Sequence, residues 1–137
     1  MITKKGYSKD QTLMPDGIAL TLPVAFFQDR NMTIDQFKKY FERLMANEDV
    51  TWNFKLSNLP KQDILYVYFI FGGFIQYRLI FVQYERNQTK QFKDSTDKKV
   101  RTFTSCNWVI CCGPAIKPIE EWPQKGFQGF RYTTHLF

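Results

Sequence analysis

The side chains most suited to metal binding or nucleophilic catalysis are Cys106, Cys111, Cys112 and His135. None of these cysteines has the Cys-x-x-Cys spacing of a zinc site, and adjacent cysteines on a strand point to opposite faces. A cysteine nucleophile would need His135, the only histidine, as its base. We therefore expect three structural thiols, no metal site and no cofactor.

Other catalytic patterns are equally scarce. The sequence has no glycine-rich phosphate loop and no serine nucleophile elbow. The paired glutamates Glu120 and Glu121 lie in a proline-rich segment, where exposure to solvent is expected. This pattern disfavours a conventional enzyme and predicts no catalytic residue.

Basic side chains interleaved with aromatic rings are the remaining chemical signal. Nucleobases stack on aromatic faces while arginine and lysine meet phosphates, a combination that suits a single strand or a flipped base. The pattern predicts a nucleic-acid site with Trp52 and Trp108 as stacking walls. Arg78, Lys125 and Arg131 would contact phosphates or base edges. Alternatively, the rings belong to the core and the charges to an ordinary solvated surface.

Composition supports a polyanionic partner. The 137 residues carry a formal net charge of +6, and 18% of them are aromatic, including 14 phenylalanines. A positive charge of this size favours nucleic acid or an acidic membrane surface. The surplus of rings leaves some of them available for stacking.

Three observations indicate a cytoplasmic protein with no membrane partner. No apolar stretch follows Lys4 and Lys5, so we expect no secretory signal. The apolar run from Ile64 to Ile75 is too short to span a bilayer. The odd number of cysteines argues against a disulfide framework.

A long hairpin from Asp63 to Tyr84 is the strongest structural signal. Two runs rich in aromatic and β-branched residues flank Gly72 and Gly73, which supply the positive φ of a tight turn. Alternation along the strands then gives two faces. The predicted core face carries no charge or amide and consists of Ile64, Tyr66, Tyr68, Ile70, Ile75, Tyr77, Leu79 and Phe81. The predicted mixed face consists of Leu65, Val67, Phe69, Phe71, Phe74, Gln76, Arg78 and Ile80.

The rest of the chain predicts one main helix and four further strands. The helix is expected at 33–47, where Thr33 and Gln36 fit a capping box. A first strand is expected at 18–27, with Pro23 at an edge, a bulge or the strand's end, because proline cannot donate to a ladder. The other expected elements are strands at 52–56, 100–112 (one strand, or two with a bulge) and 125–137, an arm at 1–17 and a long polar loop at 85–99.

Together these elements predict a single α+β domain over residues 1–137. We expect a small curved antiparallel sheet or a partly closed β-barrel of five to six strands with one main helix. The element order, with the stretch PKQDILYVY at 60–68 before the hairpin, resembles the PUA-like barrel superfamily, which includes the ASCH, EVE and YTH domains. Gln62 stands where those domains often have glycine, and the ASCH pattern Gly-x-Lys-x-x-Glu is absent. The resemblance implies a small barrel with an aromatic-lined cleft that can hold a nucleobase.

Three functions remain open on this reasoning. The first is non-enzymatic binding of DNA or RNA, with a modified or flipped base held in the cleft. The second is a protein-interaction or self-association module, such as a homodimer, that uses an exposed aromatic face of the sheet. The third is a small enzyme of nucleotide metabolism.

Overall fold

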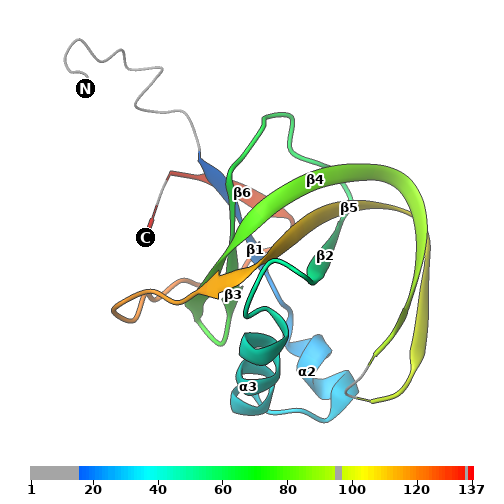
Figure 1. Ribbon diagram of the computed structural model, residues 1–137, viewed down its shortest axis with the longest axis horizontal. Helices are drawn as coiled ribbons and strands as arrows, with labels where there is room; N and C mark the ends of the chain where they lie inside the picture. Colours follow the sequence, from blue (N-terminus) through cyan, green and yellow to red (C-terminus); the bar gives the residue numbers. More distant parts are fainter. Residues whose placement is uncertain (1–15, 95–96, 135) are drawn as a thin grey trace.

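The computed structural model describes residues 16–94, 97–134 and 136–137. Within them, six strands form one sheet in the order β2-β5-β4-β3-β1-β6 (Figure 1). Neighbouring strands are antiparallel except β1 and β3, which are parallel. Along the chain the elements are β1 (Gly17–Thr21), α2 (Val24–Arg30), α3 (Ile34–Leu44), β2 (Thr51–Leu56), β3 (Tyr66–Phe71), β4 (Phe74–Lys93), β5 (Val100–Ile116) and β6 (Phe130–Thr133).

This architecture confirms the α+β class and corrects its details. Over the described residues the sheet is open, because β2 and β6 stand at opposite ends of the strand order, so the predicted partly closed barrel is wrong. The parallel pairing of β1 with β3 makes the sheet mixed. Parallel neighbours need a long crossover connection, and here α2, α3 and β2 provide it. Residues 1–15 of the predicted arm lie outside the described part, and Gly17 already belongs to β1.

The helix expected at 33–47 is present as α3, and the structure adds a second short helix, α2. The predicted strand at 18–27 ends at Thr21, and Pro23 occupies the N-cap of α2. Proline cannot extend a ladder but fits the start of a helix, so the chain changes from strand to helix there. The capping box of α3 is confirmed, because the Gln36 amide donates to Thr33 Oγ1 at 3.1 Å and the Thr33 amide to Gln36 Oε1 at 2.9 Å.

The glycine turn of the long hairpin is also confirmed. Gly72 and Gly73 have φ values of 63° and 82°, a region in which other L-residues are strained. They join β3 to β4 with Phe71 opposite Phe74.

A β-bulge beside this turn changes the predicted faces of the hairpin. Phe69 pairs with Tyr77, whereas Ile70 pairs with Ile75, so Gln76 is the extra residue of the bulge. Cross-strand partners share a face, and the extra residue exchanges the faces of β3 relative to those of β4. The predicted faces therefore hold beside the turn, where Ile70 and Ile75 share a face. They are wrong beyond the bulge, where Tyr68 shares a face with Arg78 and not with Tyr77 and Leu79.

Both faces of the sheet bury apolar side chains. The main core lies between the sheet and the helices, and its fully buried members are Ile18, Phe37, Phe41, Met45, Val67, Phe69, Tyr77, Leu79, Val109 and Cys111. A second cluster comprises Ala19, Tyr68, Ile70 and Ile75, against which Trp122, Phe127, Leu136 and Phe137 pack. The segment that follows β5 thus covers the sheet on the side away from the helices.

Strands β4 and β5 continue their pairing well beyond the short hairpin. Their ladder reaches Lys93 and Val100, so the predicted loop at 85–99 is wrong except for the connection between those two residues. The register shifts repeatedly along this ladder, and Asn87 and Ser105 have positive φ values of 52° and 51°. Such irregularities increase twist and bend a ladder. The two strands curve around and bring their tip back to α2 (Figure 1).

Candidate functional site

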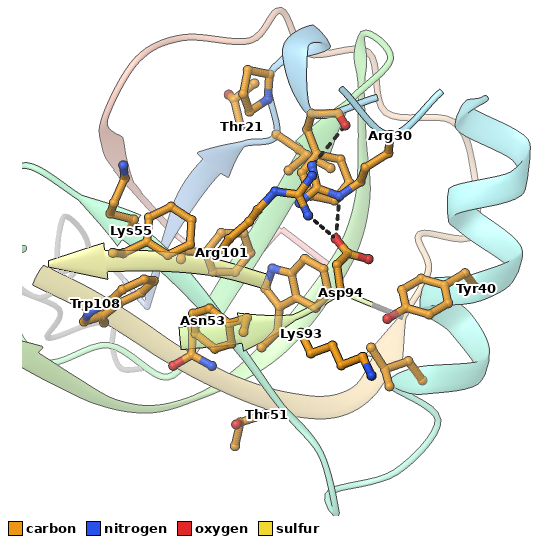
Figure 2. A pocket seen from close by; sticks show the side chains of 18 residues that line it. Thr21, Arg30, Tyr40, Thr51, Asn53, Lys55, Lys93, Asp94, Arg101 and Trp108 are labelled. Carbon is orange, nitrogen blue, oxygen red and sulfur yellow. Dashed lines mark hydrogen bonds and ion pairs between the residues drawn. The ribbon is translucent and has the colours of Figure 1, made fainter. Parts of the chain in front are cut away.

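A cavity of about 370 Å³ lies between α2, α3, strand β2 and the far end of the β4–β5 hairpin (Figure 2). Ligand pockets in proteins commonly measure roughly 300–1,000 Å³, so this volume suits a small molecule or one nucleotide unit. Seven of its 18 lining residues are aromatic: Phe26, Tyr40, Trp52, Phe54, Phe92, Phe103 and Trp108. We call it the aromatic cavity.

The helices supply one side of the aromatic cavity through residues four positions apart. Phe26 and Arg30 lie on one face of α2, and Tyr40 and Leu44 lie on one face of α3. The opposite side comes from edge strand β2, whose residues Thr51 to Lys55 all line the cavity. The cavity therefore exists only when the helices, the edge strand and the curved hairpin are all in place.

Trp52 is the wall residue that joins the cavity to the core. Its ring is half-buried and meets Phe41 edge-on, with ring centres 5.0 Å apart and planes at 81°. A second edge contact, to Phe37, has ring centres 6.0 Å apart. Edge-to-face contacts of this kind restrict ring orientation, so Trp52 is held as a preformed surface.

Trp108 closes the end of the cavity toward the hairpin. Only 2% of its surface is exposed, and Nε1 donates to the Gln88 carbonyl oxygen at 2.9 Å. The rings of Phe92 and Phe103 each lie 5.6 Å from its ring centre. Because protein rings already surround Trp108, we expect it to support the cavity wall more than to stack on a ligand.

The aromatic cavity carries an excess of positive charge. Its lining includes four cationic side chains, Arg30, Lys55, Lys93 and Arg101, and one carboxylate, Asp94. Lys55 and Lys93 are exposed residues, and the Lys55 ammonium lies 5.1 Å from the centre of the Phe103 ring. An anionic group is therefore the charged group that the lining favours.

Asp94 lies between two arginines. Arg30 Nε is 2.7 Å and Arg101 Nη1 is 3.3 Å from Asp94 Oδ2. Asp97 binds the other side of Arg101, with Nη2 to Oδ2 at 2.6 Å, and these hydrogen bonds hold the pKa of Asp97 well below its usual range. The ion pairs connect the tip of the β4–β5 hairpin to α2.

Asn53 adds an amide to the aromatic cavity. Its Oδ1 is buried and has no hydrogen-bond partner among the described residues. A buried acceptor without a partner is costly. Rotation of the side chain exchanges the carbonyl and the amino group, so Asn53 can offer either an acceptor or a donor to a ligand.

The predicted site residues divide between two places. Trp52 and Trp108 line the aromatic cavity, whereas Arg78, Lys125 and Arg131 do not. The structure therefore brings the two predicted stacking residues to one cavity but not the three predicted cations.

Arg78 and Arg131 lie on the side of the sheet that carries the second cluster. Arg78 of β4 pairs with Tyr68 of β3, and Tyr68 pairs with Ala19 of β1. Ala19 pairs with Arg131 of β6. Because cross-strand partners share a face, all four side chains lie on the same face of the sheet. The Arg78 guanidinium is 4.4 Å from the Tyr66 ring centre and donates to the Phe137 carbonyl oxygen. Internal contacts thus already engage Arg78.

The Arg131 guanidinium is 4.2 Å from the ring centre of Phe127 in the covering segment. Lys125 is exposed in the same segment and does not line the aromatic cavity. The sheet separates Arg78 and Arg131 from that cavity.

Five residues of the cavity are functional candidates that sequence reasoning misses: Arg30, Phe92, Asp94, Arg101 and Phe103. Four of them fall in or beside the segment that we expected to be a polar loop. Arg101 and Phe103 lie in the strand expected at 100–112, whose alternation is typical of a half-exposed strand, whereas the residues at 88–93 show no alternation that could have found Phe92 and Asp94.

The thiols stand apart from the aromatic cavity. Cys106, Cys111 and Cys112 are free, and burial raises the pKa of the Cys111 thiol well above its ordinary value. In the described part of the chain, no three His, Cys, Asp or Glu side chains gather to hold a metal ion. Neither described helix is long and apolar enough to cross a membrane.

Comparison with known proteins gives no relative. No protein-family model, no curated protein and no solved structure matches this chain.

Proposed function

We propose that this protein is a non-enzymatic binding protein whose aromatic cavity holds a phosphate-bearing nucleobase. The base belongs either to a free nucleotide or to an exposed position in a DNA or RNA strand. The single observation that supports this function is the aromatic cavity itself, with its flat rings, its polar Asn53 and its four cations.

The lining matches the three parts of such a ligand. The flat base would lie against the half-buried ring of Trp52, where stacking is worth roughly 1–3 kcal/mol per base. The Tyr40 hydroxyl offers a hydrogen bond to a polar base edge. The cationic side chains favour the phosphate.

Binding without catalysis also fits the lining. Among the described residues, no cysteine, histidine or serine lines the aromatic cavity, and its one carboxylate, Asp94, is paired with Arg30 and Arg101. The open sheet lacks the barrel that a PUA-like domain would have, so the cavity alone supports the proposal.

The predicted phosphate contacts need revision under this proposal. Arg78 and Arg131 lie across the sheet from the aromatic cavity and Lys125 does not line it, so these cations are not the ones that the cavity offers to a nucleotide. The cations that line the cavity take that role: Arg30, Lys55, Lys93 and Arg101. A protein-interaction module is less well supported, because the helices cover one face of the central strands and the segment after β5 covers the other.

A binding panel tests the proposal. The ligands are the four ribonucleoside 5′-monophosphates and short single-stranded DNA and RNA oligonucleotides, titrated into the wild type and into Trp52→Ala. We expect at least one ligand to bind, with a loss of roughly 1–3 kcal/mol in Trp52→Ala. Tighter binding of the oligonucleotide than of the monophosphate would identify a strand as the source of the base.

Trp122→Ala is the matched control. It removes the same half-buried ring type from the second cluster, across the sheet from the cavity. Both variants are first checked for a cooperative unfolding transition. Equal losses of affinity in the two folded variants, or no binding of any ligand to the wild type, would contradict the proposed function.

A further inference from the structure

Two guanidinium groups converge on one oxygen atom inside the aromatic cavity. Arg30 Nε and Arg101 Nη1 both donate to Asp94 Oδ2, at 2.7 and 3.3 Å (Figure 2). The two arginines come from α2 and β5, which are far apart along the chain. A pair of arginines aimed at one oxygen is the arrangement that binds phosphate or carboxylate groups.

Each arginine is held in place by contacts other than Asp94. Arg30 Nη1 donates to the Phe26 carbonyl oxygen at 3.1 Å, and the guanidinium lies 3.6 Å from the centre of the Phe26 ring. Arg101 makes two hydrogen bonds to Asp97, at 3.1 and 2.6 Å. The pair would therefore keep its orientation if the Asp94 carboxylate moved away.

The pair is also placed where its charge is effective. The exposed fractions of the Arg30, Asp94 and Arg101 side chains are 11%, 15% and 24%, so solvent screens them less than surface charges. Asp94 lies at the tip of the hairpin, where its backbone is fixed by hydrogen bonds with Lys98 and Lys99. Rotation of its side chain can free the arginines without breaking that tip.

We propose that Arg30 and Arg101 form the seat of the ligand's phosphate and that Asp94 is a built-in competitor for it. In the ligand-free protein the carboxylate occupies the seat, and a phosphate monoester displaces it. The monoester carries about 1.5 to 2 negative charges at pH 7 and three acceptor oxygens, against one charge for the carboxylate. This inference rests on the proposed function, because the aromatic walls hold the base of the same ligand.

Comparison of ribonucleosides with their 5′-monophosphates separates the seat from the rest of the cavity. Each of the four nucleosides and its monophosphate is titrated into the wild type by calorimetry. The affinity for the nucleoside reports on the aromatic walls. The difference in affinity between a monophosphate and its nucleoside reports on the seat. We expect the monophosphate to bind at least about tenfold more tightly, as charge-assisted hydrogen bonds imply.

Two variants test the roles of the arginine and the carboxylate. Arg30→Gln should lower monophosphate affinity about tenfold or more and leave nucleoside affinity unchanged. Asp94→Asn removes the competitor with little change of shape, and it should raise monophosphate affinity severalfold without affecting the nucleoside. Arg131→Gln and Glu121→Gln are the matched controls, because they make the same charge changes in the segment beyond β5. Neither control should alter the difference within a pair.

Three outcomes would overturn the inference. In the first, the wild type binds a nucleoside and its monophosphate equally well. This outcome is observed without any variant and does not contradict the proposed function. In the second, folded Asp94→Asn binds the monophosphate more weakly, which would mean that Asp94 serves only to attach the hairpin tip to α2. In the third, the controls reproduce the effects of the variants, which would assign them to net charge. If no member of any pair binds the wild type and the oligonucleotides do not bind either, the proposed function fails as well.

Discussion

At the scale of single residues, Tyr77 and Glu42 make the main polar contact between α3 and the sheet. Tyr77 is fully buried and donates from its hydroxyl to Glu42 Oε2 at 2.6 Å, and Lys117 Nζ lies 3.3 Å from Glu42 Oε1. Burial alone would raise the pKa of Glu42, but the hydrogen bonds from Tyr77 and Lys117 lower it overall. Burial, followed by the bond to Glu42, raises the pKa of Tyr77 well above its ordinary value.

These shifts predict how stability depends on pH. The pKa of Glu42 is lowered in the folded state, so its contribution is present above its unfolded pKa and is lost as pH falls through the folded value. The pKa of Tyr77 is raised, so its contribution is complete below its unfolded pKa of about 10 and declines as pH rises above it. Tyr77→Phe should cost roughly 1–3 kcal/mol at pH 7 and should lessen the loss of stability above pH 10.

Urea denaturation at a series of pH values measures both effects. Tyr132→Phe serves as the control, because Tyr132 is exposed and should show a much smaller change at every pH. Parallel stability curves for wild type and Tyr77→Phe above pH 10 would be inconsistent with the raised pKa of Tyr77.

Residue types predict part of the candidate site but not its assembly. Trp52 and Trp108 can be identified from the sequence as members of one site, and both line the aromatic cavity. Arg78 and Arg131 look equivalent to Arg30 and Arg101 in the sequence. Which cation faces the cavity depends on long-range pairing, which local sequence patterns do not encode.

At the scale of the elements, the hairpin turn and the capped helix α3 follow from local rules. Glycine at positive φ and the reciprocal bonds of a capping box are each determined by residues close in sequence. The bulge at Gln76 does not follow from local rules. One extra residue in β4 exchanges the faces of β4 relative to those of β3, yet the alternation of side-chain types along β4 gives no sign of it. In the same way, Pro23 marks a break in the chain but does not say that a helix follows.

The extension of β4 and β5 is the element that the polar sequence conceals. The strand expected at 100–112 is present in β5, but the residues at 88–93 of β4 are mostly exposed and lack the apolar alternation that identifies a half-buried strand. Their pairing depends on the partner strand and on the ring cluster of Phe92, Phe103 and Trp108.

Hydrogen exchange tests this extension directly. We expect peptides covering 88–93 and 100–104 to exchange more slowly than the exposed connection at 117–121, because backbone pairing protects amides. The folded wild type is labelled in deuterated buffer under native conditions and then digested, and mass spectrometry measures the deuterium content of each peptide. Exchange of the two ladder segments at the rate of an unpaired chain would show that the extension is not a stable part of the fold.

At the scale of the whole molecule, the aromatic cavity is a product of distant segments. It requires α2 and α3, edge strand β2 and the returning tip of β4–β5 to meet in one place (Figure 1). The net charge of +6 is spread over both sides of the sheet, so overall charge alone cannot locate a binding site. The fold class could be predicted from composition and alternation, whereas the cavity could be found only from the three-dimensional arrangement.

The most direct test of the aromatic cavity uses the three tryptophans of the chain as internal reporters. Trp52 and Trp108 line the cavity, and Trp122 lies across the sheet in the second cluster. Their indole N–H groups give separate signals in a proton–nitrogen NMR spectrum, which is recorded while a nucleoside 5′-monophosphate is added. We predict that the signals of Trp52 and Trp108 shift in proportion to ligand bound while that of Trp122 stays in place. A shift of Trp122 alone, or no shift of any indole signal at saturating ligand, would contradict the assignment of this cavity as a nucleotide site.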